Sequence, residues 1–181
     1  MEFKSDLSFK ICLFGDGGVG KTTLANHYLT GIFDETIKMT MGAVIHVKTM
    51  EIEGYNIYLQ IWDFGGEDLF SVLLPTYSVG AFGGIFMYDI TRLISLYKCE
   101  EWITKFKQGL EEDPSKVPII MAAGKIDLKH QRIVSDDEVN KYASKFNIKH
   151  IIECSSKTGE NVELVFETLV RDILKQREFI K

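Results

Sequence analysis

The stretch Gly15-Asp16-Gly17-Gly18-Val19-Gly20-Lys21-Thr22 matches the pattern G-x-x-x-x-G-K-[ST] at every position. An apolar run, residues 9–14, precedes it, and residues 23–29 read as the start of a helix. Glycines permit backbone turns that other residues avoid, so several N–H groups can point at one anion, and the helix N-terminus adds partial positive charge. We therefore expect this loop to hold phosphate.

Two side chains of the loop can bind a phosphate group and its metal ion. Lys21 would reach the β- and γ-phosphates, and the Thr22 hydroxyl would ligate Mg²⁺. A glycine-rich turn without a ligand is the plainer reading, but the strand before the loop and the helix after it argue against that reading. The predicted nucleotide-binding residues at this end of the chain are Gly15, Asp16, Gly17, Gly18, Val19, Gly20, Lys21, Thr22 and Thr23.

Length and charge limit the classes of protein. The 181 residues fit one domain, so we expect residues 1–181 to form a single unit. We also expect a monomer. There are 21 basic and 26 acidic residues, interspersed, and the net charge is -5. Because this gives neither a basic field nor a polybasic tract, nucleic acid is not expected as a partner.

The cysteines and the start of the chain indicate the cytoplasm. Cys12, Cys99 and Cys154 are odd in number and widely spaced in apolar or helical segments, which is typical of reduced core thiols. The first residues, 1–4, show no secretory apolar region and no Gly at position 2 for myristoylation. No apolar run reaches transmembrane length, so we expect a soluble chain.

Apolar strands alternate with helical patterns along the chain. The terminal helix carries an apolar stripe from Val162 to Ile173, and Ser135 to Glu138 form a capping box before another helix. We expect strands at 8–14, 43–52, 55–62, 83–89, 117–123 and 148–153, and helices at 21–30, about 96–110, 135–146 and from 162 onward. Residues 63–68 would end the third strand, and Pro75 and Gly80 keep the next segment irregular or briefly helical.

This alternation predicts an α/β fold. Crossover helices imply a mostly parallel sheet covered on both faces, with one antiparallel edge strand supplied by the hairpin at Glu53-Gly54. Ligands of such sheets bind at the carboxyl ends of the strands. With the glycine-rich loop, the expected architecture is the three-layer P-loop NTPase fold with a six-stranded sheet.

The loop alone permits ATPases, kinases and GTPases, and other motifs decide between them. The sequence resembles the Ras superfamily of small GTPases, most closely its Rab branch, over about residues 8–176. The resemblance rests on several motifs in register, namely Trp62-Asp63-x-Gly65-Gly66-Glu67, Phe70, Pro75-Thr76-Tyr77, Gly80-Ala81, Tyr88-Asp89-Ile90-Thr91, Thr40-Met41-Gly42 and residues 153–162. It implies a guanine-nucleotide switch that binds GTP or GDP with Mg²⁺ and hydrolyses GTP.

The resemblance also implies roles for particular residues. Asp63 would hold Mg²⁺ through water and Thr40 would reach the ion only with the triphosphate, so that Thr22, Thr40 and Asp63 form the metal site. The backbone N–H of Gly66 would meet the γ-phosphate. Residues 33–42 and 63–77 would be the nucleotide-sensing switches, through which effectors and GTPase-activating or exchange proteins bind. An edge-strand threonine and a turn glycine are the plainer readings of Thr40 and Gly66.

Lys125-Ile126-Asp127 resembles the end of the guanine-reading motif Asn-Lys-x-Asp. The carboxylate of Asp127 can accept two hydrogen bonds from guanine, which adenine cannot donate, and Lys125 would lie over the base. Gly124 stands where the family has Asn, so we expect binding weaker by about 0.5 to 1.5 kcal/mol for the lost hydrogen bond. The remaining predicted contacts to the base are Ser155, Ser156, Lys157 and Phe33, of which Phe33 could equally be a core residue.

A second departure concerns hydrolysis. Glu67 stands where most of the family places the Gln that orients the attacking water. A carboxylate cannot donate to the transferred phosphoryl group, and its charge repels the charge that develops there. The plainer reading is that Glu67 does not face the phosphate and that a different residue positions the water. With Lys21, Thr40, Gly66 and Glu67 as the catalytic set, and Lys38 as the one cation in residues 31–42, we expect slow hydrolysis unless a partner supplies an arginine.

Three readings stay open at this point. The first is a slow GTPase switch, and the second is a degenerate, non-hydrolysing GTPase that acts as a protein-binding module. The third is a P-loop kinase of small substrates, which is disfavoured because nothing in this sequence resembles an acceptor-binding lid rich in arginine. Rab-like proteins carry prenylated cysteines at the end of a flexible tail, but this sequence ends at Lys181 just after its last helix. We therefore expect no encoded membrane anchor; a trimmed tail and a divergent or prokaryotic protein that works in solution both fit.

Overall fold

The computed structural model describes residues 5–181, apart from the side chain of Leu69. Residues 1–4, where we expect neither a signal segment nor a myristoylation site, lie outside the described residues. The strands form one six-stranded sheet in the order β2-β3-β1-β4-β5-β6. They are β1 (Asp6–Phe14), β2 (Ala43–Ile52), β3 (Tyr55–Phe64), β4 (Gly83–Asp89), β5 (Ile119–Gly124) and β6 (His150–Glu153).

The expected topology is confirmed. β2 pairs antiparallel with β3 at one edge, and the other pairs are parallel. β3 is longer than predicted, because Asp63 and Phe64 do not break the strand but continue its register opposite Val44 and Ala43. β5 begins two residues late, after Pro118, which has no N–H to donate to a ladder. β6 also begins two residues late, because Ile148 donates its N–H to the carbonyl of Ala143, near the end of the preceding helix.

The predicted helices are present, and one of them is divided. They are α1 (Lys21–Thr30), α2 (Asp68–Ser71), α3 (Leu74–Tyr77), α4 (Leu93–Tyr97), α5 (Cys99–Gln108), α6 (Asp136–Phe146) and α7 (Val162–Gln176). The expected single helix over 96–110 was wrong, because α4 ends at Tyr97 and α5 begins at Cys99, with Lys98 as the cap between them. A 3-10 helix, η1 (Ile126–Gln131), was not predicted.

Local signals at helix ends behave as expected. Gly31 ends α1 with φ 72°, a left-handed conformation that glycine adopts without a Cβ penalty. The Ser135 side chain accepts from the Glu138 backbone N–H, and the Glu138 side chain takes the Ser135 N–H, which completes the predicted capping box. No helix in the described part of the chain combines the length and hydrophobicity that crossing a membrane requires.

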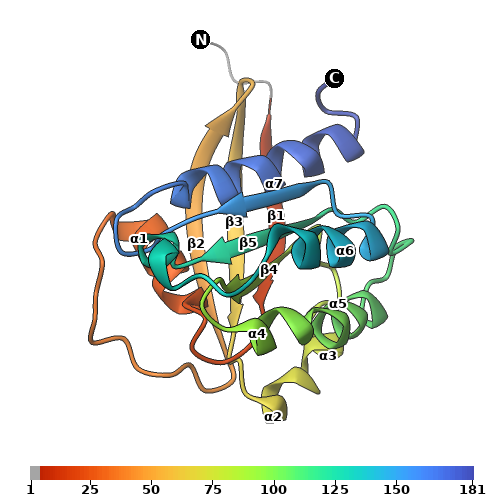
Figure 1. Cartoon of the computed structure of the whole chain (residues 1–181). Coiled ribbons are helices and arrows are strands. Elements are labelled where there is room, and N and C mark those ends of the chain that lie inside the picture. Colours follow the sequence, from red (N-terminus) through yellow and green to blue (C-terminus); the bar gives the residue numbers. More distant parts are fainter. Residues whose placement is uncertain (1–4) are drawn as a thin grey trace.

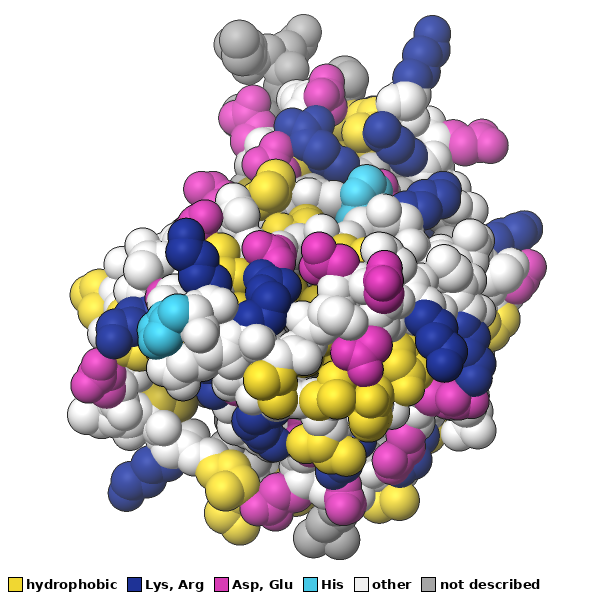
Figure 2. Space-filling model, viewed as in Figure 1, with side chains coloured by type: hydrophobic (Ala, Val, Ile, Leu, Met, Phe, Trp, Pro, Cys, Tyr) yellow, Lys and Arg dark blue, Asp and Glu magenta, His cyan; other side chains and the backbone are white. Residues whose placement is uncertain are grey.

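Helices cover both faces of the sheet (Figure 1), and β1 supplies both cores because successive side chains of a strand point to opposite faces. Ile11 and Leu13 pack with α1 and α7, whereas Cys12 and Phe14 pack with α3, α4, α5 and α6. On the face seen in Figure 2, basic side chains lie among acidic ones, with apolar side chains exposed between them. The three cysteines are free and buried, as predicted.

Candidate functional site

A cavity of about 490 Å³ lies at the carboxyl ends of β1, β4 and β5, where the sheet topology predicts a ligand. Most of the predicted residues line it: Gly17, Gly18, Val19, Gly20, Lys21, Thr22, Thr23, Phe33, Thr40, Gly66, Lys125, Asp127, Ser156 and Lys157. The wall also contains Ile37, Lys38, Met39, Phe64, Met87 and Leu128. The predicted residues outside the wall are Gly15, Asp16, Asp63, Glu67 and Ser155.

The glycine-rich loop depends on its glycines for close packing. A Cβ on Gly15 would lie 2.2 Å from the Met87 carbonyl oxygen, and its φ of 142° is one that L side chains rarely adopt. Lys21, at the start of α1, is buried, and its Nζ donates to the carbonyl oxygens of Gly15 and Asp16 at 2.8 Å each. Burial lowers the pKa of Lys21 to about 8, against the nearby charges of Asp63 and Asp16. The ammonium is therefore held inside the loop.

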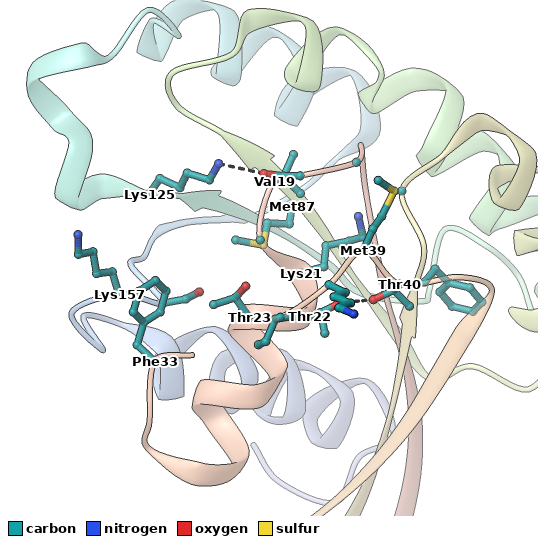
Figure 3. Close-up of a pocket in the computed structure, with 18 of the residues that line it drawn as sticks. Val19, Lys21, Thr22, Thr23, Phe33, Met39, Thr40, Met87, Lys125 and Lys157 are labelled. Atoms are coloured by element: carbon teal, nitrogen blue, oxygen red, sulfur yellow. Dashed lines mark hydrogen bonds between the residues drawn. The ribbon is translucent and has the colours of Figure 1, made fainter. Parts of the chain in front are cut away.

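Three oxygens from three segments meet beside Lys21. Thr22 Oγ1 lies 2.5 Å from Thr40 Oγ1 and donates to Asp63 Oδ2 at 2.5 Å (Figure 3 shows the contact between the two threonines). Asp63 is fully buried at the end of β3, and its Oδ1 has no hydrogen-bond partner in the described part of the chain. Burial raises the pKa of Asp63 to about 6, although the Thr22 hydroxyl and Lys21 act to lower it.

This oxygen cluster fits Mg²⁺. The ion takes hard oxygen ligands, and it is usually held by one or two carboxylates together with phosphates and water. One carboxylate and two hydroxyls match that pattern, and residues 5–181 contain no group of three His, Cys, Asp or Glu side chains that would suit a different metal. The unpartnered Oδ1 of Asp63 supplies a further buried acceptor. The metal set predicted from the sequence is thus brought together in space.

Gly66 and Glu67 follow β3, but Gly66 lines the cavity and Glu67 does not. A Cβ on Gly66 would lie 2.3 Å from the Gly17 backbone nitrogen, so only glycine lets these two segments approach. Glu67 is exposed, lies outside the cavity wall and begins α2, where its carbonyl accepts from the N–H groups of Phe70 and Ser71. In this arrangement the Glu67 side chain does not take part in the cavity.

The other end of the cavity carries the residues predicted to bind the base. Figure 3 shows Phe33, Lys125 and Lys157 there, opposite Lys21, Thr22 and Thr40. Asp127 Oδ1 accepts a hydrogen bond of 2.6 Å from the Ser155 hydroxyl. That hydroxyl oxygen also accepts from the N–H groups of Lys157 and Thr158, at 3.2 and 3.1 Å. Ser155, which is buried, therefore holds Asp127 and the 155–158 loop in place rather than lining the cavity itself.

Sequence reasoning missed Met87, which occupies the space that a side chain at position 124 would enter. A Cβ on Gly124 would lie only 2.5 Å from Met87 Cε, and Met87 lines the cavity although it is almost fully buried. Met87 comes from β4 and Gly124 from the neighbouring β5. The long methionine beside a glycine was a signal only once the pairing of these two strands was known.

The contacts of three other residues, Arg92, Lys98 and His27, were also missed. Arg92, just before α4, donates from Nη1 to the Gly17 carbonyl and from Nη2 to Asp16 Oδ2, at 2.7 Å each. Lys98 Nζ lies 3.0 Å from Asp16 Oδ1 and 2.9 Å from Asp68 Oδ1. His27 Nδ1 lies 2.7 Å from the Ser156 carbonyl. The one sequence signal for Arg92 was its position directly after Asp89-Ile90-Thr91, at the carboxyl end of a strand next to β1.

The fold and the glycine-rich loop define an α/β protein of the P-loop NTPase class. Residues 10–175 match the model of the Ras family. The chain is 36% identical over 169 residues to GTP-binding nuclear protein GSP1 of Encephalitozoon cuniculi, covering 93% of this chain and 77% of that protein. It is 36% identical over 169 residues to Ras-related protein Rab-8B of Homo sapiens (93% and 80% covered), and 32% identical over 168 residues to Ras-related protein Rab-11A of Dictyostelium discoideum (93% and 77%).

The chain therefore belongs to the Ras family of small GTPases, near its Rab branch. This confirms the resemblance seen in the sequence motifs. It also makes the cavity the expected place for a nucleotide, because the glycine-rich loop and Asp127 both line it.

Proposed function

We propose that this protein is a guanine-nucleotide switch that binds GTP or GDP with Mg²⁺ and hydrolyses GTP slowly. One observation carries the proposal: Thr22 Oγ1 lies 2.5 Å from both Thr40 Oγ1 and Asp63 Oδ2. These residues come from the phosphate loop, the first switch segment and the end of β3, where the second switch segment begins. A single ion between them would sense whether all three segments are in place.

The chain's own residues support phosphate and metal binding. Thr22, Thr40 and Asp63 would hold Mg²⁺, which when bound neutralises charge that develops on the phosphate oxygens. Lys21 would exchange its two carbonyl acceptors for phosphate oxygens without leaving its buried position. Gly66, packed against the Gly17 nitrogen, would present its backbone N–H to the terminal phosphate. The oxygens and donors that face the cavity thus suit a triphosphate.

The base is proposed to be guanine. Asp127 lines the cavity and is oriented by the Ser155 hydroxyl, so its carboxylate can accept from two guanine donors. Lys125 extends from η1's N-terminal end to the phosphate loop, where its Nζ donates to the Gly18 carbonyl at 2.9 Å. Its stem would therefore lie along the base. The relatives named above as GTP-binding and Rab proteins support the same choice.

Slow hydrolysis follows from what faces the terminal phosphate. Glu67 is exposed and could orient water only if the start of α2 moved. Even then its carboxylate could accept from water but could not donate to the phosphoryl group. Lys38 is the one cation that residues 31–42 offer, and it lines the cavity. An activating partner that inserts an arginine would supply the missing positive charge.

The two switch segments are the proposed partner surface. Residues 33–42 and 63–77 carry exposed apolar side chains, among them Met39, Met41 and Val72. The edge strand β2 between these segments exposes further apolar residues, Val44, Ile45 and Val47. Effectors and exchange or activating proteins would read this surface, because its conformation depends on the terminal phosphate.

We also propose that the chain works as one domain, as a monomer, in the cytoplasm. Three free cysteines without a disulfide partner support a reducing compartment. Burial also raises the pKa of each thiol to about 12, which leaves it unreactive. Nucleic acid is not proposed as a partner, because the chain has a net charge of -5.

Single-turnover hydrolysis tests the function. Wild type and Lys21→Ala would be loaded with GTP and Mg²⁺, and phosphate release followed over hours. We expect slow release from wild type and release no faster than the protein-free control from Lys21→Ala. If wild type binds GTP stably but releases no more phosphate than Lys21→Ala does, the protein is a non-hydrolysing module.

A further inference from the structure

An arginine lies against the outer side of the phosphate loop, in a place that no role above explains. Arg92 directly follows Asp89-Ile90-Thr91, and its backbone is fixed by a network of hydrogen bonds. Asp89 Oδ1 accepts from the Thr91 N–H and hydroxyl, at 2.8 and 2.7 Å, and the Ser95 hydroxyl donates to the Arg92 carbonyl at 2.6 Å. Asp89 and Ser95 are buried, so the hydrogen bonds that hold this turn are shielded from water.

The guanidinium makes two bonds to neighbouring residues of the loop. Nη1 donates to the Gly17 carbonyl and Nη2 to Asp16 Oδ2, at 2.7 Å each. The Asp16 side chain is only 9% exposed, and its other oxygen binds Lys98 at 3.0 Å. Because the guanidinium is planar, its two bonds fix Asp16 and the Gly17 carbonyl relative to each other. A lysine could not impose that geometry.

The bond to Gly17 determines where the next N–H points. Residues 17 and 18 are joined by a trans peptide, in which C=O and N–H point in opposite directions. With the Gly17 carbonyl turned out to Arg92, the Gly18 N–H faces the cavity that Gly18 lines. Lys125 acts in the same way one peptide later, because its bond to the Gly18 carbonyl turns the Val19 N–H inward.

The result is a pair of successive donors aimed at one space. Neither the Gly18 nor the Val19 N–H has an acceptor among residues 5–181. Successive N–H groups that converge in this way form a concave binding place for anions. Lys125 belongs to the guanine-reading motif, whereas Arg92 follows the Asp89-Ile90-Thr91 motif and is not part of it.

We propose that Arg92 is a positioning residue for phosphate binding: it holds the Gly17 carbonyl outward, so that the Gly18 N–H is aimed at the phosphates of the bound nucleotide. This inference rests on the proposed function, since it takes a nucleotide as the ligand. Arg92 itself does not line the cavity, and it acts through the loop.

A simpler account would give Arg92 only an electrostatic or structural role. Its charge would attract any phosphate, and its ion pair with Asp16 would stabilise the loop. Lys98 provides a matched control, because Lys98→Ala removes an equal charge from Asp16 and leaves the Gly17 carbonyl bound to Arg92. The two accounts differ in how the two variants compare.

The experiment measures dissociation constants for GDP, for a non-hydrolysable GTP analogue and, by competition, for guanosine. The proteins are wild type, Arg92→Ala, Arg92→Met and Lys98→Ala, each checked by thermal unfolding without nucleotide. Arg92→Met keeps the length of the side chain in case Arg92→Ala folds poorly. We expect both Arg92 variants to bind GDP and the GTP analogue about tenfold or more weakly than wild type does, the loss typical of a charge-assisted hydrogen bond. Guanosine should bind as it does to wild type.

Lys98→Ala should reduce the affinity for GDP and the GTP analogue by less than about threefold, as expected for a partly exposed ion pair. Equal losses in the Arg92 and Lys98 variants would overturn the positioning role, and so would a loss of guanosine binding as large as that of GDP. Unchanged affinity in both Arg92 variants would also overturn it. Failure of wild type to bind any guanine nucleotide would instead contradict the proposed function.

Discussion

The hydroxyl of Thr22 lies 2.5 Å from the hydroxyl of Thr40, although 18 positions separate the two residues in the chain. One belongs to the first turn of α1 and the other to the loop before β2. Asp63 accepts from Thr22 on the same side, so the three oxygens form one cluster at the phosphate loop. The glycine-rich loop, the segment before β2 and the end of β3 therefore meet at a single point.

Thr40→Ala should weaken the binding of the triphosphate more than the binding of the diphosphate. The hydroxyl of Thr40 is expected to reach Mg²⁺ only when the terminal phosphate is present, so the variant should bind a GTP analogue with Mg²⁺ about tenfold more weakly, as for a lost charge-assisted hydrogen bond, and GDP nearly as well as wild type. Thr36→Ala is the matched control, since Thr36 is exposed in the same segment and, among the described residues, forms hydrogen bonds only with Asp34. Equal behaviour of the two variants in a fluorescent-nucleotide titration would rule out the assigned role of Thr40.

Asp63→Asn should stabilise the nucleotide-free protein against unfolding at pH 8. The same substitution should abolish the gain in nucleotide affinity that Mg²⁺ provides. Burial raises the pKa of Asp63 from 3.8 to about 6, so its ionised form destabilises the fold. The stabilisation from a protonated Asp63 is complete below pH 3.8 and is lost as the pH rises through 6, by about 1 to 3 kcal/mol. Urea unfolding of wild type and Asp63→Asn at pH 5 and pH 8 measures this difference.

The same carboxyl predicts how Mg²⁺ binding depends on pH. Protons compete with the ion for Asp63, so the Mg²⁺-dependent gain in nucleotide affinity should shrink as the pH falls below 6. A gain that stays constant from pH 5 to pH 8, or an Asp63→Asn protein less stable than wild type at pH 8, would contradict this account of the site.

Gly124→Asn alone should tighten guanine nucleotide binding little, because the new Cβ would lie 2.5 Å from Met87 Cε and the methionine must move. The Met87→Ala/Gly124→Asn protein removes that obstacle. Relative to Met87→Ala, it should bind GDP about two- to tenfold more tightly, the gain expected from one hydrogen bond. Isothermal titration of wild type, the two single variants and the double variant with GDP tests whether Met87 blocks the new side chain. No tightening in the double variant relative to Met87→Ala would show that Gly124 does not weaken binding.

Glu67→Gln should hydrolyse GTP faster than wild type in a single turnover. An amide can both accept from water and donate to the phosphoryl group, and it carries no negative charge. Glu111→Gln, which changes an exposed glutamate outside the cavity wall, should leave the rate as it is. A wild type that is as fast as Glu67→Gln would mean that another residue positions the water.

Much of the fold could be predicted from the sequence because it depends on local signals. The apolar strands, the capping box at Ser135 and the left-handed Gly31 each act within a few residues, and the structure confirms them. The break between α4 and α5 was missed because a helical apolar stripe continues across it. The length of β3 was missed because Asp63 looks polar in sequence but is buried where β3 pairs with β2.

The site divides in the same way. The glycine-rich loop and the three residues proposed to hold Mg²⁺ follow motifs, so these residues could be named in advance. Met87 and Arg92 could not, because their contacts depend on which strands are neighbours and on how long side chains cross between them. Glu67 was expected at the phosphate on the basis of the motif, whereas in the structure it is exposed.

The identity of the nucleotide that co-purifies with the protein tests the central claim most directly. Wild type would be purified with Mg²⁺, denatured, and its ligand identified by chromatography and mass. A guanine nucleotide, mainly GDP with some GTP, is the predicted result, and it should be absent from an Asp127→Ala protein. Recovery of an adenine nucleotide, or of guanine nucleotide at equal occupancy from Asp127→Ala, would contradict the claim that this cavity is a guanine-nucleotide switch.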